Sequence, residues 1–172
     1  MLQNGASKVY AVDVGYGQLD YKLRNDPRVV NMEKCNIRYI DKSLIEPLDF
    51  ISVDVSFISL SLIFPVASDM IKDSGKMVCL IKPQFEAGRE QVGKKGIVRD
   101  RKVHVQVIEN VIKYTIKNGL RPAGLTYSPV TGAKGNIEFL LYIDGKLKQD
   151  EIFDDEILDI REIVNTSHEE LE

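Results

Sequence analysis

The stretch FISVDVSFISLSLIFPVASDMIKDSGKMVCLIK, residues 50–82, contains the pattern that decides the fold. Its two ends, Phe50–Val55 and Met77–Ile81, are apolar runs with the length and composition of buried strands. Gly75 is expected to break the chain before the second strand. Between the strands, residues 59–71 predict a helix with one apolar side, formed by Leu60, Ile63, Ala67 and Ile71. A strand, a helix and a second strand in this order predict a parallel pair.

The alternation of strands and helices extends to both sides of this stretch. The further expected elements are a strand at 8–14, a helix at 16–25, a strand at 28–33, a helix at 100–118, and strands at 120–126 and 137–143. The last two strands have no helix between them, which predicts an antiparallel hairpin at one edge. We therefore expect an α/β fold, with a doubly wound, mostly parallel sheet that carries helices on both faces.

Composition places the chain among soluble globular proteins and excludes several classes. The chain has 172 residues, of which 44% are hydrophobic and 28% charged, enough for one domain with a real core. The two cysteines, Cys35 and Cys79, match no metal or redox spacing, and two histidines are too few for a metal site. The longest apolar stretch, residues 50–67, contains Asp54 and Pro65, so we expect no membrane span.

Charge is distributed unevenly along the chain. Residues 150–172 hold ten acidic side chains and one basic one, whereas the remainder holds 22 basic and 16 acidic. This division predicts a main domain at 1–145 and an acidic C-terminal helix at 146–172, with an apolar face formed by Phe153, Ile157, Ile160 and Val164. A mildly basic body suits a polyanionic partner, although a solvated surface explains the same charge.

Three apolar runs each contain one ionisable residue: Asp54, Lys82 and Glu138. An unpaired charge is costly in a buried strand, so the three together indicate one site. Asp54 and Lys82 come at the carboxyl ends of expected parallel strands, where open α/β sheets bind their ligands. Alternatively, Asp54 caps the next helix and Lys82 emerges into solvent. Glu138 lies among apolar neighbours, so its carboxylate needs a charged or polar partner, and Lys82 is the expected one.

Two further segments have the composition of binding loops. Asp13-Val14-Gly15-Tyr16-Gly17 fits the Gly-rich first turn of a nucleotide site, the acidic end of a second strand that binds ribose hydroxyls, or simply a tight turn. The segment from Pro83 to Lys102 is expected to be a long polar loop, either a phosphate-backbone contact or an exposed mobile loop. Its basic side chains include Arg89, Lys94, Lys95 and Arg99. Phe85 and Tyr127 are candidates either for stacking on a base or for the core.

Five motifs together resemble those of the TlyA-type haemolysins, whose catalytic domain is an FtsJ-like rRNA 2′-O-methyltransferase. They are residues 9–19 (VYAVDVGYGQL), 54–60 (DVSFISL), 81–89 (IKPQFEAGR), 96–100 (GIVRD) and 135–139 (GNIEF). The resemblance covers about residues 1–145 and implies a Rossmann-like fold that binds S-adenosylmethionine. It also implies methyl transfer to ribosomal RNA in ribosomal subunits, in the cytoplasm and without a metal.

The family's catalytic residues are a Lys-Asp-Lys-Glu tetrad. Asp54, Lys82 and Glu138 match its last three members. The resemblance implies that Lys82 orients the ribose hydroxyl and stabilises the developing alkoxide, or accepts its proton, while Asp54 and Glu138 position Lys82. If the loop binds a phosphate backbone, the expected RNA contacts are its basic side chains Arg89, Lys94, Lys95 and Arg99. The cofactor is expected to contact Asp13, Val14, Gly15, Asn36 and Asp54.

The family's first lysine and its Gly-rich cofactor motif would both lie upstream of Met1. Met1–Ala6 reads like the end of a helix with Gly5 as its cap, so the first strand of the sheet is expected to be missing. The resemblance further implies a preceding RNA-binding module in the full-length protein, and we expect the chain by itself to be inactive. Two rival hypotheses are a non-catalytic RNA-binding or membrane-active haemolysin, and an NAD-dependent oxidoreductase with Asp13 on the adenosine ribose.

Overall fold

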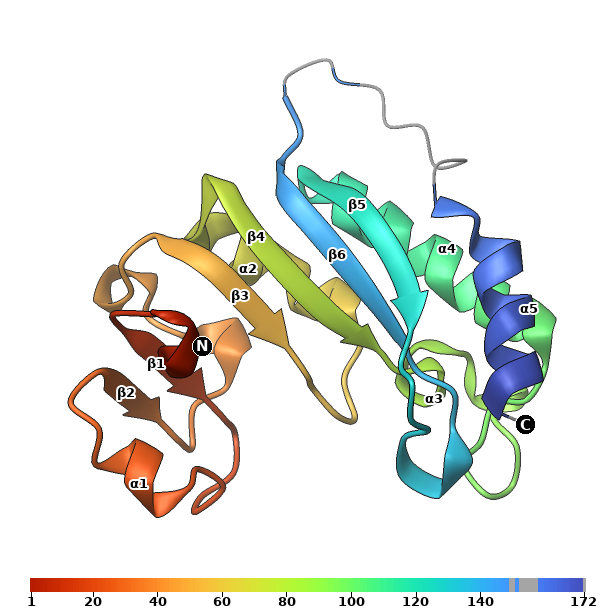
Figure 1. Ribbon diagram of the computed structural model, residues 1–172, viewed down its shortest axis with the longest axis horizontal. Coiled ribbons are helices and arrows are strands. Elements are labelled where there is room, and N and C mark those ends of the chain that lie inside the picture. The colour runs from red at the N-terminus through yellow and green to blue at the C-terminus, as the bar shows by residue number, and fades with distance from the viewer. Residues whose placement is uncertain (149–150, 152–157, 172) are drawn as a thin grey trace. The chain divides into compact units, whose positions relative to one another are not determined.

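Figure 1 shows the protein as a computed structural model that describes residues 1–148, 151 and 158–171. The chain forms two compact units, Met1–Glu46 and Pro47–Glu172. The unit boundary lies just before the apolar stretch that predicted the fold, and each unit has its own sheet.

The first unit contains a two-stranded parallel sheet made of β1 (Val9–Val12) and β2 (Val29–Met32). Its helical elements are η1 (Leu2–Asn4), α1 (Tyr21–Arg24), η2 (Ile37–Tyr39) and η3 (Lys42–Leu44). Gly5 follows η1 in the left-handed conformation, with φ 92°, as the sequence predicts for a cap. The helix expected at 16–25 shrinks to four residues, because Gly17 has φ 73° and Asp20 caps the helix at the backbone of Lys22.

The second unit contains a four-stranded sheet in the order β3-β4-β6-β5. Its strands are β3 (Leu48–Val53), β4 (Ile71–Ile81), β5 (Leu120–Tyr127) and β6 (Phe139–Lys146). Its helical elements are η4 (Leu60–Leu62), α2 (Phe64–Met70), α3 (Pro83–Glu86), η5 (Arg89–Gln91), α4 (Arg101–Lys117), η6 (Ala133–Gly135) and α5 (Ile160–Leu171). β3 and β4 are parallel, whereas β6 is antiparallel to both β4 and β5. The predicted edge hairpin is therefore present, with β6 inserted between β4 and β5.

One face of this sheet forms the core of the second unit, with α2 and α4 behind it (Figure 1). Side chains alternate along β4 and β6, so that the core receives Met77, Cys79, Ile81, Phe139, Leu141 and Ile143. The apolar positions predicted for the first helix, Leu60, Ile63, Ala67 and Ile71, are all buried, although Ile71 begins β4. Val107 and Val111 of α4 are buried as well. The opposite face of β4 is only half-buried at Val78 and Leu80, which differs from the expectation of helices covering both faces.

Two local predictions in the second unit are wrong. The helix expected at 59–71 is divided into η4 and α2, because Pro65 lacks a backbone N–H and lies in the first turn of α2, where no partner is needed. Gly75 does not break the chain but lies inside β4. A Cβ on Gly75 would meet the carbonyl oxygen of Leu48 at 2.9 Å, so glycine allows β3 and β4 to approach at their register shift.

The acidic C-terminal segment forms a helix that is shorter than predicted. α5 begins at Ile160, and the expected positions Phe153 and Ile157 lie outside the described residues. Val164 is buried, and His168 lies 2.9 Å from His104 of α4, nitrogen to nitrogen. The hydroxyl of Tyr127 donates to Glu170 at 2.7 Å. Tyr127 therefore helps to hold α5 against β5.

In the described part of the chain, no helix is both long and apolar enough to cross a membrane. Residues 1–148, 151 and 158–171 contain no group of three or more His, Cys, Asp or Glu side chains arranged to hold a metal ion.

Candidate functional site

The candidate site is built around Lys82, directly after the carboxyl end of β4. Its ammonium lies 2.6 Å from Oδ1 of Asp54 and donates to Oγ of Ser56 at 3.2 Å. The side chain of Lys82 is only 13% exposed, whereas that of Asp54 is 68% exposed. Because β3 and β4 are parallel neighbours, the residues that follow them meet at the same end of the sheet. The structure therefore brings Asp54 and Lys82 together as predicted.

Glu138 lies at the same end of the sheet but does not pair with Lys82. β4 and β6 are antiparallel and pair Ile81 with Phe139, so Lys82 and Glu138 each lie one residue beyond the last pair. Oε1 of Glu138 instead accepts from Nε2 of Gln84 at 2.9 Å. The expected Lys82–Glu138 ion pair is therefore wrong: the sheet aligns the two residues, but the carboxylate has a neutral partner.

Gln84 is a residue of this site that sequence reasoning missed. α3 begins at Pro83 directly after Lys82, and its first turn carries Gln84 towards Glu138. Oε1 of Gln84 is buried and has no hydrogen-bond partner among the described residues. Turning the amide over would place that oxygen against the carboxylate, so Glu138 fixes the orientation of the side chain. The sequence contained one indication of this role, because Gln84 is a polar residue only two positions after Lys82.

Gly132 makes room for the carboxylate of Glu138. A Cβ built on Gly132 would overlap the carboxylate atoms of Glu138. The backbone N–H of Gly132 donates to the carbonyl oxygen of Asn136 at 2.8 Å, which holds the loop in this position. The carboxylate of Glu138 is therefore enclosed by the loop on one side and by Gln84 on another.

Substituting Gly132 by alanine is expected to displace Glu138 and to destabilise the protein. Overpacking of this kind costs about 1–3 kcal/mol in the free energy of unfolding. Gly124→Ala is the matched control, because a Cβ there meets its nearest atom, Cβ of Tyr142, at an ordinary 3.6 Å. Urea unfolding of both variants measures the difference. Equal stability of the two variants would show that Glu138 moves aside without cost.

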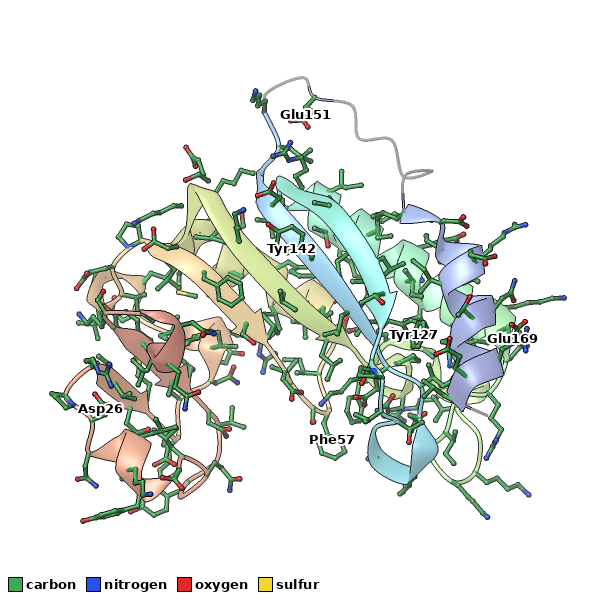
Figure 2. The ribbon with its side chains drawn as sticks, in the orientation of Figure 1. Asp26, Phe57, Tyr127, Tyr142, Glu151 and Glu169 are labelled. Atoms are coloured by element: carbon green, nitrogen blue, oxygen red, sulfur yellow. The ribbon has the colours of Figure 1, made fainter. Side chains whose placement is uncertain are left out.

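Phe57 is a second residue that the sequence did not reveal. It follows the site residues Asp54 and Ser56, has φ 63° and is 90% exposed. A left-handed backbone is strained for a bulky residue, and an exposed phenyl ring gains nothing from burial. The ring contacts that of Phe85, with centroids 4.8 Å apart, and projects from the loop after β3 (Figure 2). The two rings are tilted by 48° to one another and form an apolar surface at α3, which begins directly after Lys82.

Glu86 links the two loops that carry these residues. Its carboxylate accepts from the hydroxyl of Ser59 and from the backbone N–H of Leu60, both at 2.7 Å. Burial raises the pKa of Glu86 above its ordinary value, while these two hydrogen bonds act in the opposite direction. The contacts join α3 to the beginning of η4. They fix the loop that contains Asp54 and Phe57 relative to α3.

The residues predicted to bind a cofactor include four that lie in the first unit. The carboxylate of Asp13 is exposed, and its Oδ1 accepts from the N–H of Gly15 at 2.6 Å. Oδ2 of Asp13 has no partner within the described residues, so it is available to a hydroxyl donor. Val14 is 71% exposed, and Asn36 uses its Oδ1 to cap η2. This arrangement fits a ribose with vicinal hydroxyls.

Glu33, the other acidic residue near a strand end in this unit, has a structural role. Its side chain is 6% exposed and contacts the guanidinium of Arg24 at 2.8 Å. Burial alone would raise the pKa of Glu33, but hydrogen bonds from Asn31, Leu19 and Gln18, together with Arg24, hold it below its ordinary value. Glu33 therefore anchors the turn that follows Asp13 and is not available to a ligand.

The four predicted RNA contacts lie between α3 and α4. Arg89 begins η5, while Lys94, Lys95 and Arg99 line a surface cavity of about 450 Å³. All four side chains are exposed, and none forms an ion pair within the described part of the chain. The structure therefore places Arg89 outside the lining of the cavity that the other three share.

Comparisons with known proteins identify relatives of this chain. The model of the FtsJ-like methyltransferase family matches residues 1–144. A Bacillus subtilis protein provisionally named rRNA methyltransferase YqxC is 53% identical over 83% of this chain and 51% of its own length. The Mycobacterium tuberculosis 16S/23S rRNA (cytidine-2′-O)-methyltransferase TlyA is 39% identical over 83% of this chain and 54% of its own length. The chain thus spans about half the length of these relatives.

Solved structures give the same result for the fold. A Streptococcus thermophilus protein, provisionally described as a haemolysin, superposes with a TM-score of 0.91 at 47% identity, over 99% of this chain and 61% of that chain. A Listeria monocytogenes protein, provisionally described as an S-adenosylmethionine-dependent methyltransferase, gives a TM-score of 0.57 at 18% identity over 84% of this chain and 83% of that chain. The second similarity concerns the fold alone and confirms the predicted Rossmann-like methyltransferase fold.

Proposed function

Because the chain belongs to the FtsJ-like methyltransferase family, we propose that it is the catalytic part of an enzyme that methylates the ribose 2′-hydroxyl of ribosomal RNA. The observation that carries this proposal is the placement of Lys82 at the end of β4, held by Asp54 and Ser56 and aligned with Glu138 across the sheet. The named activity of the TlyA relative supports the choice of acceptor.

The proposed methyl donor is S-adenosylmethionine, which supplies an activated methyl group on its sulfonium when bound. Asp13 would hold the ribose hydroxyls of the donor through its free carboxylate oxygen. Val14, Gly15 and Asn36 would line the adenosine, with the half-buried Asn36 near the base. Asp54 is the remaining predicted contact of the cofactor. None of these residues is a metal ligand in this proposal.

Lys82 would prepare the acceptor. An ammonium has three N–H donors, and Asp54 and Ser56 occupy two of them. The third is available to the 2′ oxygen, where it orients a lone pair and stabilises the negative charge that develops as the hydroxyl loses its proton. The proton would leave to solvent by way of the exposed Asp54 carboxylate. The 2′ oxygen would form its bond to the methyl carbon as the carbon–sulfur bond of the donor breaks, which leaves a neutral thioether. Alignment of the two reactants supplies much of the acceleration.

Methyl transfer to intact ribosomal subunits tests this proposal. The test protein carries the upstream residues of the Bacillus subtilis relative before Met1 of this chain, and the label is a tritiated methyl group. We expect label on the ribose of ribosomal RNA, recovered as a 2′-O-methyl nucleoside. Label on a base, or binding of NAD in preference to S-adenosylmethionine, would overturn the proposal. Leakage of lipid vesicles without methylation would favour a membrane-active protein instead.

The basic residues suit a nucleic-acid substrate. Arg89, Lys94, Lys95 and Arg99 would contact phosphates of the RNA, which fix its position without reading its sequence. A cytoplasmic location follows from a ribosomal substrate. The exposed ring of Phe57, supported by Phe85, would stack on a base next to the reacting ribose.

Replacing Phe57 by glycine is expected to separate stability from function. Glycine adopts φ 63° without strain, so the melting temperature should stay the same or rise. Loss of base stacking costs about 1–3 kcal/mol in binding, so the KM for RNA should rise about fivefold or more. Leu62→Gly, which removes an exposed apolar side chain from η4, is the comparison variant. An unchanged KM in Phe57→Gly would exclude stacking.

A further inference from the structure

Asn136 fastens the basic loop between α3 and α4 to the loop that precedes Glu138. It is 1% exposed. Its Oδ1 accepts from the backbone N–H of Val98 at 3.0 Å, and its Nδ2 donates to the carbonyl oxygens of Gly96 and Ala133, both at 3.0 Å. A buried amide with all three bonds made to backbone fixes both loops. The basic loop is therefore not the mobile segment that the sequence alone allowed.

This attachment brings a further cation, Lys134, onto the basic loop. Lys134 has φ 60° and an exposed side chain. Its Nζ lies 3.7 Å from the position that a Cβ on Gly96 would occupy. Lys134, Lys95 and Arg99 line a cavity of about 420 Å³, together with Ile97. Three cations from two loops thus converge on one concave surface.

The cavity has no compensating negative charge. Its lining contains no acidic residue, and Lys95, Arg99 and Lys134 form no ion pair with any described residue. Like charges on one surface repel one another, so an anion bound among them lowers this repulsion. The nearest acidic residue in sequence, Asp100, lines the adjoining cavity instead. A concave surface lined by one sign of charge also concentrates the field, which draws counter-ions into it.

The cavity belongs to the same loop that encloses the candidate catalytic carboxylate. Gly132, two residues before Lys134, packs against the carboxylate of Glu138, and Glu138 is two residues after Asn136. We propose that Lys95, Arg99 and Lys134 form a preformed cradle for a phosphodiester of the RNA, next to the ribose that is methylated. The proposal rests on the proposed function for the identity of the polyanion and for the methylated ribose beside it.

The salt dependence of RNA binding by the 172-residue chain tests the cradle without any methyl transfer. The probe is a fluorescein-labelled single-stranded RNA, and the dissociation constant is measured at increasing KCl. Lys134→Gln is expected to reduce the slope of log Kd against log salt by about 0.7, the value for one phosphate contact on a single strand. The reduction should be equal for two RNAs of unrelated sequence, because a phosphate contact carries no sequence information.

Three further variants separate a cradle from general electrostatic attraction. Lys113→Gln removes one charge from an exposed position in the middle of α4 and should leave the slope unchanged. Lys134→Arg should restore the slope. Asn136→Ala should reduce the slope by more than Lys134→Gln does, because it releases Lys95 and Arg99 from Lys134. Thermal melting monitored by circular dichroism shows whether each variant is folded. If Asn136→Ala is unfolded, the comparison of Lys134→Gln with Lys134→Arg still tests the cradle.

The outcomes also distinguish this proposal from the proposed enzyme activity. An unchanged slope in Lys134→Gln, or an equal loss in Lys113→Gln, overturns the cradle even if the extended protein methylates RNA. A selective loss in Lys134→Gln supports the cradle even if methylation fails.

Discussion

Lys82→Ala is expected to reduce methyl transfer by at least about 100-fold in the N-terminally extended protein, because the acceptor oxygen loses the group that orients it and stabilises its charge. S-adenosylmethionine affinity should stay within about twofold, a shift of less than 0.5 kcal/mol. Single-turnover transfer of a tritiated methyl group measures the first quantity and isothermal titration the second. Activity at the wild-type rate would remove Lys82 from the reaction.

Lys72→Ala is the matched control for Lys82→Ala. Lys72 forms an ion pair with Asp49 at 2.6 Å, the same distance as in the Lys82–Asp54 pair, but both partners are exposed. Exposed pairs of this kind contribute about 0–1 kcal/mol, so the control should lose neither stability nor activity to a measurable extent. An equal loss of transfer in both variants would indicate a general effect on the fold.

Lys82→Arg separates the two roles that the sequence left open for this residue. A guanidinium donates hydrogen bonds but does not accept a proton in proteins. If Lys82 acts by orienting the oxygen and stabilising its charge, arginine should recover at least about tenfold of the activity lost in Lys82→Ala, equivalent to about 1.4 kcal/mol. Activity as low as that of Lys82→Ala, at every pH, would show instead that Lys82 accepts the proton.

The second large effect is expected for Glu138→Gln, which removes a negative charge with almost no change of shape. Glu138 is 7% exposed, and its carboxylate accepts a hydrogen bond from the neutral side chain of Gln84. A buried carboxylate without a cationic partner is costly to the fold, so the melting temperature should stay the same or rise. Methyl transfer should fall about 100-fold, because the charge balances the two cations of the reaction, Lys82 and the sulfonium.

Gln84→Leu provides the comparison for Glu138→Gln. Gln84→Leu leaves the charge of Glu138 in place but removes the amide that positions its carboxylate. The variant should therefore lower kcat by a smaller factor, about tenfold, and leave KM unchanged. Gln84→Glu places a second carboxylate beside the first and should be as harmful as Glu138→Gln. If Glu138→Gln loses stability and activity to the same extent, then Glu138 is a structural residue, and the catalytic interpretation is wrong.

Much of the fold could be predicted from residue patterns because those patterns report local burial. The apolar run that became β4, and the apolar side of α4, place residues in the core as the spacing indicated. The run that became β3 is less buried than expected, because Val53 lies in the core but Phe50 is exposed. The prediction that Asp54 and Lys82 meet also succeeded, since it needs only the rule that parallel strands end together. The length of α1 was wrong, because a glycine turn and a capping side chain decide where this helix begins.

The pairing of Glu138 shows where residue patterns fail. The sequence correctly indicates that a carboxylate among apolar neighbours needs a partner. The partner predicted from the sequence, the charged Lys82, is wrong. The partner is Gln84, because α3 begins immediately after Lys82 and its first turn faces β6. That orientation depends on an antiparallel register between strands about 60 residues apart in sequence, and no local pattern contains it.

The sequence by itself determined that this chain is an α/β protein of the FtsJ-like methyltransferase family, with Asp54, Lys82 and Glu138 in one region. It did so because burial, periodicity and motif spacing are local properties of the chain. Only the tertiary structure decided which partner each charge has, that Phe57 has a strained and exposed conformation, and that Asn136 draws Lys134 onto the basic loop. These features depend on contacts between distant segments and on backbone angles, which take definite values only when the chain is packed.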